Sequence, residues 1–219
     1  MAVSKKSKVK TMKTPILFTH SHPNSIISDQ FRAIRANVHF LTKEKTCKLF
    51  LITSPETGEG KSTTAANLAV SMAQKKEKIL LIDANLRDPA IQDIFDISNN
   101  GGLIDILESE EPFEEVVHQT RIENLDILTC GSFSTHFGEL LGNKKMKNLL
   151  AKLSARYDVV LIDSPSVLMS PETSLLSTYC DGVILILKRG NTKVEKIKEA
   201  KKVLDIAGAK IVGAVMNEK

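Results

Sequence analysis

A short cluster of glycines, a lysine and a serine has the composition of a phosphate-binding loop. It follows an apolar run at 49–52 and consists of Gly58, Gly60, Lys61 and Ser62. Glycines let backbone N–H groups turn toward an anion without a Cβ in the way, and a helix that starts at the loop directs its positive end to the same point. In such a loop the lysine reaches the β- and γ-phosphates of a nucleotide, and the serine hydroxyl binds Mg²⁺. The sequence therefore predicts a nucleotide-binding P-loop.

The match to the P-loop pattern is incomplete at its first position. The full pattern, G-x-x-x-x-G-K-[ST], begins with a glycine where this chain has Pro55. A Gly-x-Gly-Lys-Ser sequence can also occur in an ordinary loop that binds no phosphate. The apolar run before the loop and the helix-favouring stretch after it supply the context that the motif requires, and they favour the P-loop.

Two further apolar runs, ILLID and VVLID, end in Asp83 and Asp163. Ligands of an open parallel sheet bind beyond the carboxyl ends of the strands, so we expect both aspartates to lie near Lys61. Mg²⁺ prefers oxygen ligands and keeps several waters, so the Ser62 hydroxyl with one or two carboxylates suffices to hold it. The alternative for an aspartate at a strand end is a helix cap or a turn residue.

Apolar strands alternate with amphipathic helices after an opening segment that lacks periodicity. Residues 1–25 are predicted to form a basic flexible tail, and 26–219 a single P-loop domain. Runs such as VILIL lack polar alternation, which is typical of strands covered on both faces. We therefore predict an α/β fold, a three-layer sandwich around a mostly parallel sheet. The predicted strands are 49–53, 79–83, 125–129, 158–163, 183–188 and 211–216, and the predicted helices are 28–41, 62–76, 89–95, 102–108, 112–119, 137–155, 171–179 and 192–207.

Composition limits the classes of function. The net charge is +4, but the first 13 residues hold five lysines and no acid, so the rest of the chain is close to neutral. Beyond the tail this is not a nucleic-acid-binding composition, and we expect no nucleic acid partner. The tail is either a solubilising terminus or a weak contact for an anionic membrane surface. The three cysteines are widely spaced, which suits a reducing cytoplasm, and no apolar run is long enough to span a bilayer.

Four segments together resemble the bacterial tyrosine kinases, or BY-kinases, which belong to the MinD/ParA-like P-loop ATPases. The segments are TSPETGEGKST, LLIDANLRDP, VVLIDSP and an early Asp29-x-x-Arg32-x-x-Arg35. The P-loop alone specifies the superfamily, whereas Asp-x-x-x-Arg at 83–87 and the early arginine pair are typical of the kinases. The resemblance implies a P-loop kinase domain and an ATP- and Mg²⁺-dependent protein-tyrosine kinase that regulates capsular or exopolysaccharide biosynthesis.

The resemblance also implies a role for individual residues. The catalytic residues would be Lys61 at the β- and γ-phosphates, Asp83 orienting the tyrosine hydroxyl, and Arg87 near the transferring phosphate. Mg²⁺ would be held by Ser62, Asp83 and Asp163. The nucleotide would contact Thr57, Gly58, Glu59, Gly60, Lys61, Ser62 and Thr63 through the phosphates and Asn217 through the adenine.

Partners and location follow from the same resemblance. Asp29, Arg32 and Arg35 stand where the family has a Glu-x-x-Arg-x-x-Arg helix that assembles subunits into a ring, although on the sequence alone a solvated helix face is the better explanation of the arginines. The cytosolic tail of a separate membrane polysaccharide copolymerase would activate the kinase, and protein tyrosines would be its substrates. The expected location is the cytoplasm, peripheral at the inner face of the cell membrane through that partner.

The chain departs from the family pattern at several positions. Asn85 replaces the second acid of the usual Asp-x-Asp-x-Arg and removes a charge from the site. The usual C-terminal tyrosine cluster is missing, because the chain holds two tyrosines, Tyr157 and Tyr179. Glu56 stands where the MinD/ParA ATPases have a second lysine. Asn85 and the missing tyrosines leave open an ATP-binding regulatory module of pseudokinase type. The other alternative is a MinD/ParA-type ATPase, which the general fold favours and Glu56 disfavours.

Overall fold

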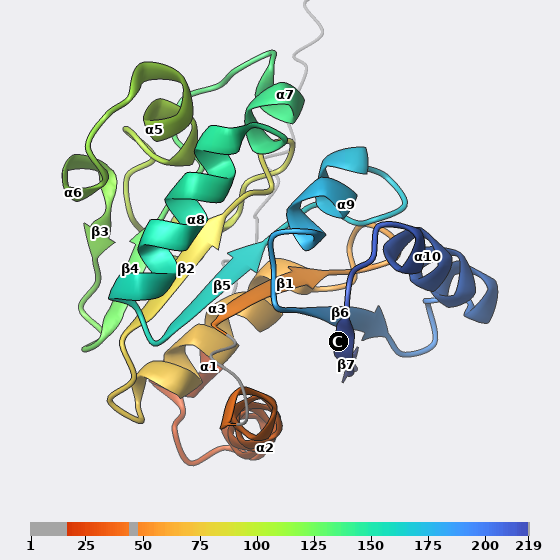
Figure 1. Cartoon of the computed structure of the whole chain (residues 1–219). Coiled ribbons are helices and arrows are strands. Elements are labelled where there is room, and N and C mark those ends of the chain that lie inside the picture. Colours follow the sequence, from red (N-terminus) through yellow and green to blue (C-terminus); the bar gives the residue numbers. More distant parts are fainter. Residues whose placement is uncertain (1–16, 44–47, 219) are drawn as a thin grey trace, which may run out of the picture.

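The computed structural model describes residues 17–43 and 48–218, which build one α/β unit around a central sheet (Figure 1). In this described part the sheet has seven strands in the order β3-β4-β2-β5-β1-β6-β7. The short pair β3–β4 is antiparallel and every other pairing is parallel. The strands are β1 (Leu49–Thr53), β2 (Ile79–Asp83), β3 (His118–Gln119), β4 (Leu125–Leu128), β5 (Val159–Asp163), β6 (Gly182–Lys188) and β7 (Ile211–Asn217).

Helices cover both faces of this sheet. On one side lie α1 (Phe18–Ser21), α2 (Ile26–Lys43) and α3 (Lys61–Ala73), and on the other side lie α8 (Lys144–Arg156), α9 (Pro171–Ser177) and α10 (Val194–Ile206) (Figure 1). Shorter helices fill the connections: α4 (Ile91–Phe95), α5 (Leu103–Ser109), α6 (Phe113–Val116) and α7 (Phe137–Leu141). The predicted three-layer α/β fold with a mostly parallel sheet is therefore confirmed.

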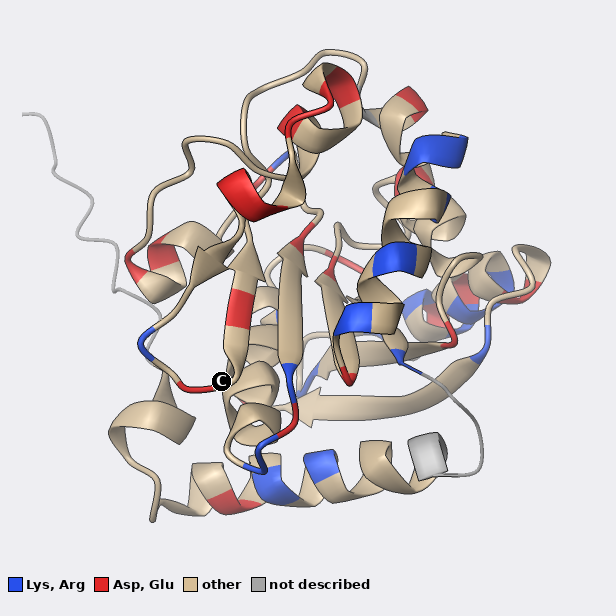
Figure 2. Cartoon of the chain, turned by 60° about the vertical axis from the view of Figure 1, so that its left-hand side comes forward, with Lys and Arg blue, Asp and Glu red and all other residues tan. Residues whose placement is uncertain are grey.

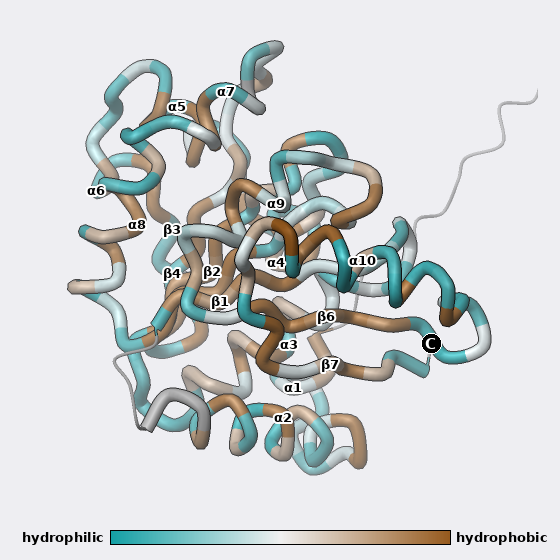
Figure 3. Tube along the Cα trace, turned by 45° about the vertical axis from the view of Figure 1, so that its right-hand side comes forward, coloured by the Kyte–Doolittle hydropathy of each residue, from teal (hydrophilic) through white to brown (hydrophobic). Residues whose placement is uncertain are grey.

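Alternating side chains of the central strands supply two separate cores. In β1, Leu51 packs with the side chains of α8, α9 and α10, whereas Phe50 and Ile52 pack with those of α3. Successive side chains of a strand point to opposite faces, so an all-apolar strand must be covered on both. Figure 3 shows the result as apolar strands inside a largely hydrophilic layer of helices. The two edge strands, β3 and β7, are less covered, since their side chains are half-buried or exposed.

Two predicted helices differ from the elements that the structure shows. The predicted helix at 137–155 is two helices, because the chain turns at Gly142 and the Asn143 side chain caps α8 by accepting the Lys145 N–H at 3.2 Å. The predicted helix at 112–119 is α6 followed by β3, which pairs antiparallel with β4. Single-sequence periodicity cannot resolve a strand this short.

The beginning of the described chain is also more ordered than the predicted boundary of the tail implies. Thr19, in α1, is buried, and its N–H and hydroxyl donate to the side chain of Asn67 in α3 at 3.0 Å and 3.1 Å. The packed part of the chain thus starts before residue 26, and residues 1–16 of the predicted tail lie outside the described residues. Among the described helices, none is both long enough and apolar enough to cross a membrane.

Candidate nucleotide-binding and active site

The loop between β1 and α3 has the backbone geometry that the glycine pattern predicts. Gly58 and Gly60 have positive φ angles of 76° and 87°, and Gly60 caps the N-terminus of α3. A Cβ at Gly60 would lie 2.2 Å from Nδ2 of Asn217, so a larger residue would displace that amide and would also have to adopt a φ that side chains disfavour. The loop thus directs backbone N–H groups and the start of a 13-residue helix at one point, which is the arrangement that binds a phosphate.

Glu59 fixes the shape of this loop from the inside. Its side chain is fully buried; Oε2 accepts the N–H of Glu56 at 3.0 Å, and Oε1 accepts the hydroxyl of Thr192. The side-chain amide of Asn217 donates to the Glu59 carbonyl at 3.0 Å. One contact within the loop and contacts from two distant segments therefore hold the loop before any nucleotide arrives. Thr192 was not among the predicted site residues, since nothing in its local sequence marks it.

The aspartates that end two strands lie side by side at the same edge of the sheet. Asp83 of β2 and Asp163 of β5 are paired in register, and β5 is in turn the neighbour of β1, which leads into the P-loop. Figure 2 shows acidic residues at the ends of the central strands on this edge. Lys61, which opens α3, is 7% exposed, and its charge acts on Asp163. The structure thus brings Lys61, Asp83 and Asp163 together, as the strand order of a parallel sheet requires.

Asp163 has an environment that favours a cation. It is fully buried, and among the described residues neither of its carboxylate oxygens has a hydrogen-bond partner. Burial and the neighbouring charge of Asp83 together raise the pKa of Asp163 to about 8, although the nearby Ser62 hydroxyl and Lys61 oppose the shift. A buried carboxylate without donors is costly unless a cation or a proton neutralises it.

The donor set around Asp163 suits Mg²⁺. In the described residues no three His, Cys, Asp or Glu side chains converge as a metal site, and the predicted ligands Ser62, Asp83 and Asp163 contain only two such residues. Mg²⁺ keeps several waters and takes further oxygens from phosphates, so one hydroxyl and one or two carboxylates fit it better than a full protein cage does.

For Asp83 the sequence left two interpretations open, a ligand of Mg²⁺ and a cap at the start of a helix, and its place in the structure is compatible with both. Its carboxylate accepts the N–H of Asn85 at 2.9 Å and those of Ala90 and Ile91 at 3.1 Å, so it caps the start of α4. Burial raises the pKa of Asp83 to about 6, although these three N–H groups oppose the shift. The aspartate is therefore held rigidly at the strand end, with its charge close to Asp163.

The loop after β2 carries the remaining predicted catalytic residue. Arg87 is 54% exposed, and its Nη2 lies 3.3 Å from Oε1 of Glu172 at the start of α9. Asn85 is buried and donates its side-chain amide to the carbonyl of Asp88 at 2.7 Å. The turn is thus built around an amide donor at position 85, a role that the carboxylate of the usual family residue cannot fill.

The residues predicted to assemble subunits have different surroundings within one chain. Asp29 and Arg32 form an ion pair along α2, and both are substantially exposed. Arg35 instead donates to the backbone carbonyl of Ser71 in α3. Burial lowers the pKa of Arg35, which nevertheless stays far above neutral pH. Arg35 therefore contributes to docking α2 on α3, and Asp29 and Arg32 remain on the surface.

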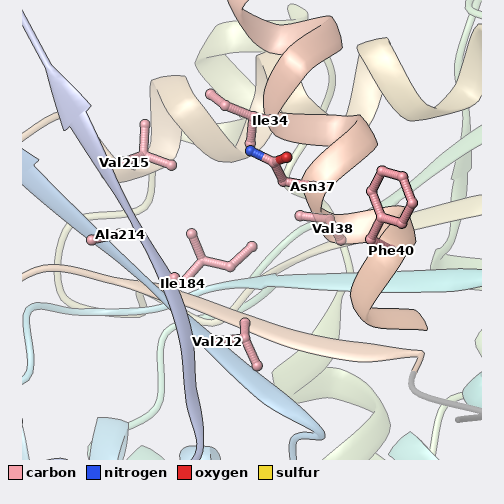
Figure 4. Close-up of a pocket in the computed structure, with 9 residues that line it drawn as sticks. Ile34, Asn37, Val38, Phe40, Ile184, Val212, Ala214 and Val215 are labelled. Atoms are coloured by element: carbon pink, nitrogen blue, oxygen red, sulfur yellow. The ribbon is translucent and has the colours of Figure 1, made fainter. Parts of the chain in front are cut away.

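A cavity of about 790 Å³ opens beside the P-loop and is large enough for a nucleoside. Its wall includes Gly58, Gly60 and Thr63 of the loop and Asn217 at the end of β7. The structure therefore places Asn217 next to the predicted phosphate cradle. A smaller hollow of about 330 Å³ lies between α2 and the β6–β7 edge; it is lined mainly by apolar side chains and contains no P-loop residue (Figure 4).

The raised pKa of Asp163 predicts a pH dependence of stability for the metal-free protein. Between the ordinary value of 3.8 and about 8 the folded state binds more protons than the unfolded state, so stability falls as pH rises through this range. We expect the melting temperature in EDTA to decline from pH 5 to pH 8.5, and to decline less in Asp163→Asn. Identical pH profiles of the two proteins would contradict this prediction.

Comparison with known proteins agrees with this geometry. A family model described as an AAA domain matches residues 47–206. The tyrosine-protein kinase YwqD of Bacillus subtilis is 38% identical over 100% of this chain and 92% of its own length. The putative tyrosine-protein kinase CapB of Staphylococcus aureus is 34% identical over 92% of this chain and 89% of its own.

Solved structures show the same relationship. The chimerical protein CapA2B2 superposes with a TM-score of 0.88 at 35% identity, covering 93% of this chain and 89% of its own. The kinase domain of the Escherichia coli tyrosine kinase ETK gives 0.89 at 26% identity, covering 97% and 84%. MinD of Pyrococcus horikoshii, solved with Mg-ADP, gives 0.67 at 25% identity over 78% and 70%. The chain therefore belongs to the bacterial tyrosine kinases, and it shares its fold with the MinD-type P-loop ATPases.

Proposed function

We propose that this protein transfers the γ-phosphoryl group of ATP to protein tyrosines with the help of Mg²⁺. The observation that carries the proposal is the buried, unpartnered carboxylate of Asp163, placed beside Lys61 and in register with Asp83. Phosphoryl transfer depends on positioning and on neutralising charge, and this site offers a cation, two carboxylates and a loop of backbone donors.

Each residue has a defined part in this proposal. Lys61 and the backbone of 57–63 bind the phosphates, and Asn217 contacts the adenine. Asp83 accepts the hydrogen bond of the attacking tyrosine hydroxyl; with a pKa of about 6 it is ionised at neutral pH yet basic enough to take the proton. Ser62 and Asp163, with Asp83 close by, would hold Mg²⁺, which when bound neutralises phosphate charge. Arg87 assists at the transferring phosphate.

The partners and the pathway are also proposals. The names of the similar kinases CapB and EpsB, and of the chimerical protein CapA2B2, support a role in capsular or exopolysaccharide biosynthesis. We propose that a membrane copolymerase activates the kinase through its cytosolic tail and keeps it at the inner face of the membrane. The exposed Asp29 and Arg32 are available for contacts between subunits of a ring.

The test is a transfer assay with purified protein, γ-labelled ATP, Mg²⁺ and a tyrosine-containing acceptor protein, with and without an activator tail. Phosphotyrosine that requires an intact P-loop supports the proposal. Tight ATP binding without phosphotyrosine in either condition would instead favour a regulatory module. Such a module would be consistent with Tyr157, which is buried and donates its hydroxyl to Asp126 at 2.7 Å and is therefore not available as an acceptor.

Asn85→Asp is expected to lower transfer several-fold, although it restores the usual family residue. An aspartate cannot donate to the Asp88 carbonyl, and its charge would face that oxygen instead. Losing a buried hydrogen bond costs about 1 kcal/mol of folding free energy. The measurement is the transfer rate together with the melting temperature in EDTA. A faster enzyme would mean that the missing charge limits the metal site.

A further inference from the structure

A buried glutamate that no motif singled out connects two of the loops at the site. Glu172 follows Asp163 along the chain and lies in the first turn of α9, where its side chain is 9% exposed. Its Oε1 lies 3.3 Å from Nη2 of Arg87, and its Oε2 accepts the hydroxyl of Ser170. The loop after β2 and the loop after β5 therefore meet at this one carboxylate.

A third segment closes over the carboxylate and restricts its position. A Cβ at Gly138 in α7 would lie 3.0 Å from Oε1 of Glu172, and a Cβ at Gly142 would lie 3.3 Å from Leu175 of α9. The two glycines let α7 pack closely on α9. The Glu172 carboxylate thus has α7 on one side, the Ser170 hydroxyl on another and the half-exposed Arg87 guanidinium on a third.

The carboxylate is held in its charged form. Burial favours the neutral acid, but the Ser170 hydroxyl, the helix backbone and the Arg87 guanidinium together hold the pKa of Glu172 below its ordinary value. A buried anion of this kind retains its charge because it has donors in fixed places. The long, half-exposed side chain of Arg87 therefore has a fixed negative charge, that of Glu172, beside it.

We propose that Glu172 is a positioning residue that holds the Arg87 guanidinium at the rim of the nucleotide site for phosphoryl transfer. A guanidinium has five N–H donors in a planar, rigid fork, so a hydrogen bond to Glu172 restricts the position and orientation of the whole group. Holding the side chain in place before the reaction removes the cost of ordering it in the transition state. This inference rests on the proposed kinase function and adds to it a residue that touches neither nucleotide nor acceptor.

The first experiment compares Glu172→Gln with Glu195→Gln, a change of the same kind at an exposed residue of α10. Glutamine keeps the shape and can still accept the Ser170 hydroxyl, but it loses the charge. We expect kcat of phosphotyrosine formation to fall roughly tenfold or more, with KM for ATP and the affinity for ADP within about twofold of wild type. Glu172→Asp should recover part of the loss. A parallel fall of ADP affinity, melting temperature and kcat would show a structural role and overturn the proposal.

A double-mutant cycle tests whether the effect passes through Arg87. If it does, Arg87→Ala with Glu172→Gln should be no slower than Arg87→Ala alone, whereas multiplied losses would overturn the inference. Because Arg87 is half-exposed, Arg87→Ala leaves no buried cavity, but it does remove the counter-charge of Glu172. Lys61→Met distinguishes a failure of the proposed kinase function from a failure of the proposed role of Glu172. If it leaves phosphotyrosine unchanged, the kinase function itself is wrong; if it abolishes transfer while Glu172→Gln matches wild type, only the role of Glu172 is wrong.

Discussion

Lys61→Met is expected to reduce phosphoryl transfer by about a thousandfold or more without unfolding the protein. The residue opens α3 inside the P-loop and is 7% exposed, so its ammonium group acts on the phosphates in surroundings of low polarity. Removing one such preorganised donor from a transition state costs about 10²–10³ in rate, and the loss of a full charge costs more. Methionine keeps the length and the packing of the lysine stem.

Single-turnover transfer and calorimetric ADP binding measure this effect directly. Lys202→Met, at an exposed position of α10, is the matched control and should behave as wild type in both. Unchanged kinetics in Lys61→Met would remove the P-loop assignment. The substitution also removes a cation that lowers the pKa of Asp163, so the metal-free variant should take up a proton there at a higher pH than wild type does.

Asp163→Asn is expected to reduce transfer by about 10²–10³-fold and, at the same time, to stabilise the metal-free protein above pH 8. The carboxylate is buried beside Asp83, with no hydrogen-bond partner among the described residues, so its ionised form destabilises the metal-free fold. Asparagine removes that charge and keeps the shape. Activity falls because a neutral amide is a weak ligand for Mg²⁺, which prefers charged oxygens.

Opposite signs for stability and activity distinguish a functional carboxylate from a structural one, because a structural residue loses both when it is replaced. The measurements are the transfer rate at saturating Mg²⁺ and chemical denaturation in EDTA at pH 8.5. Asp126→Asn, at the partner of the buried Tyr157 hydroxyl, is a useful contrast because that carboxylate has a donor. A less stable Asp163→Asn protein would contradict our account of the site.

The strands β1, β2 and β5 were predictable because each is a continuous apolar run that ends in a polar residue. Such a run is typical of a strand that is buried on both faces of a sheet. The convergence of Lys61, Asp83 and Asp163 followed from the same reasoning, since parallel strands place their ends at one edge of the sheet. Their individual roles in catalysis remain predictions, which the variants described above are designed to test.

Features that depend on tertiary contacts were not predictable in the same way. The four residues of α1 are too few to show a period, and they are held by the hydrogen bonds between Thr19 and Asn67. Glu172 lies in the first turn of α9 and Thr192 in the turn before α10, and their importance arises from Arg87 and Glu59, which are distant in sequence. One chain without its homologues carries no signal for such pairs. The sequence offered helix capping and metal binding as alternatives for Asp83. In the structure Asp83 caps α4 and also lies where the metal ligand was predicted.

The contact between Gly60 and Asn217 has a consequence for anyone who redesigns this protein. Any side chain at position 60 would collide with the amide of Asn217, and that amide in turn holds the carbonyl of Glu59. A mutagenesis library that varies either position alone will therefore sample mainly losses. Varying both codons together would relieve the collision but not the positive φ at position 60, so such a library should keep Gly60, although its constraint on Asn217 comes from the other end of the chain.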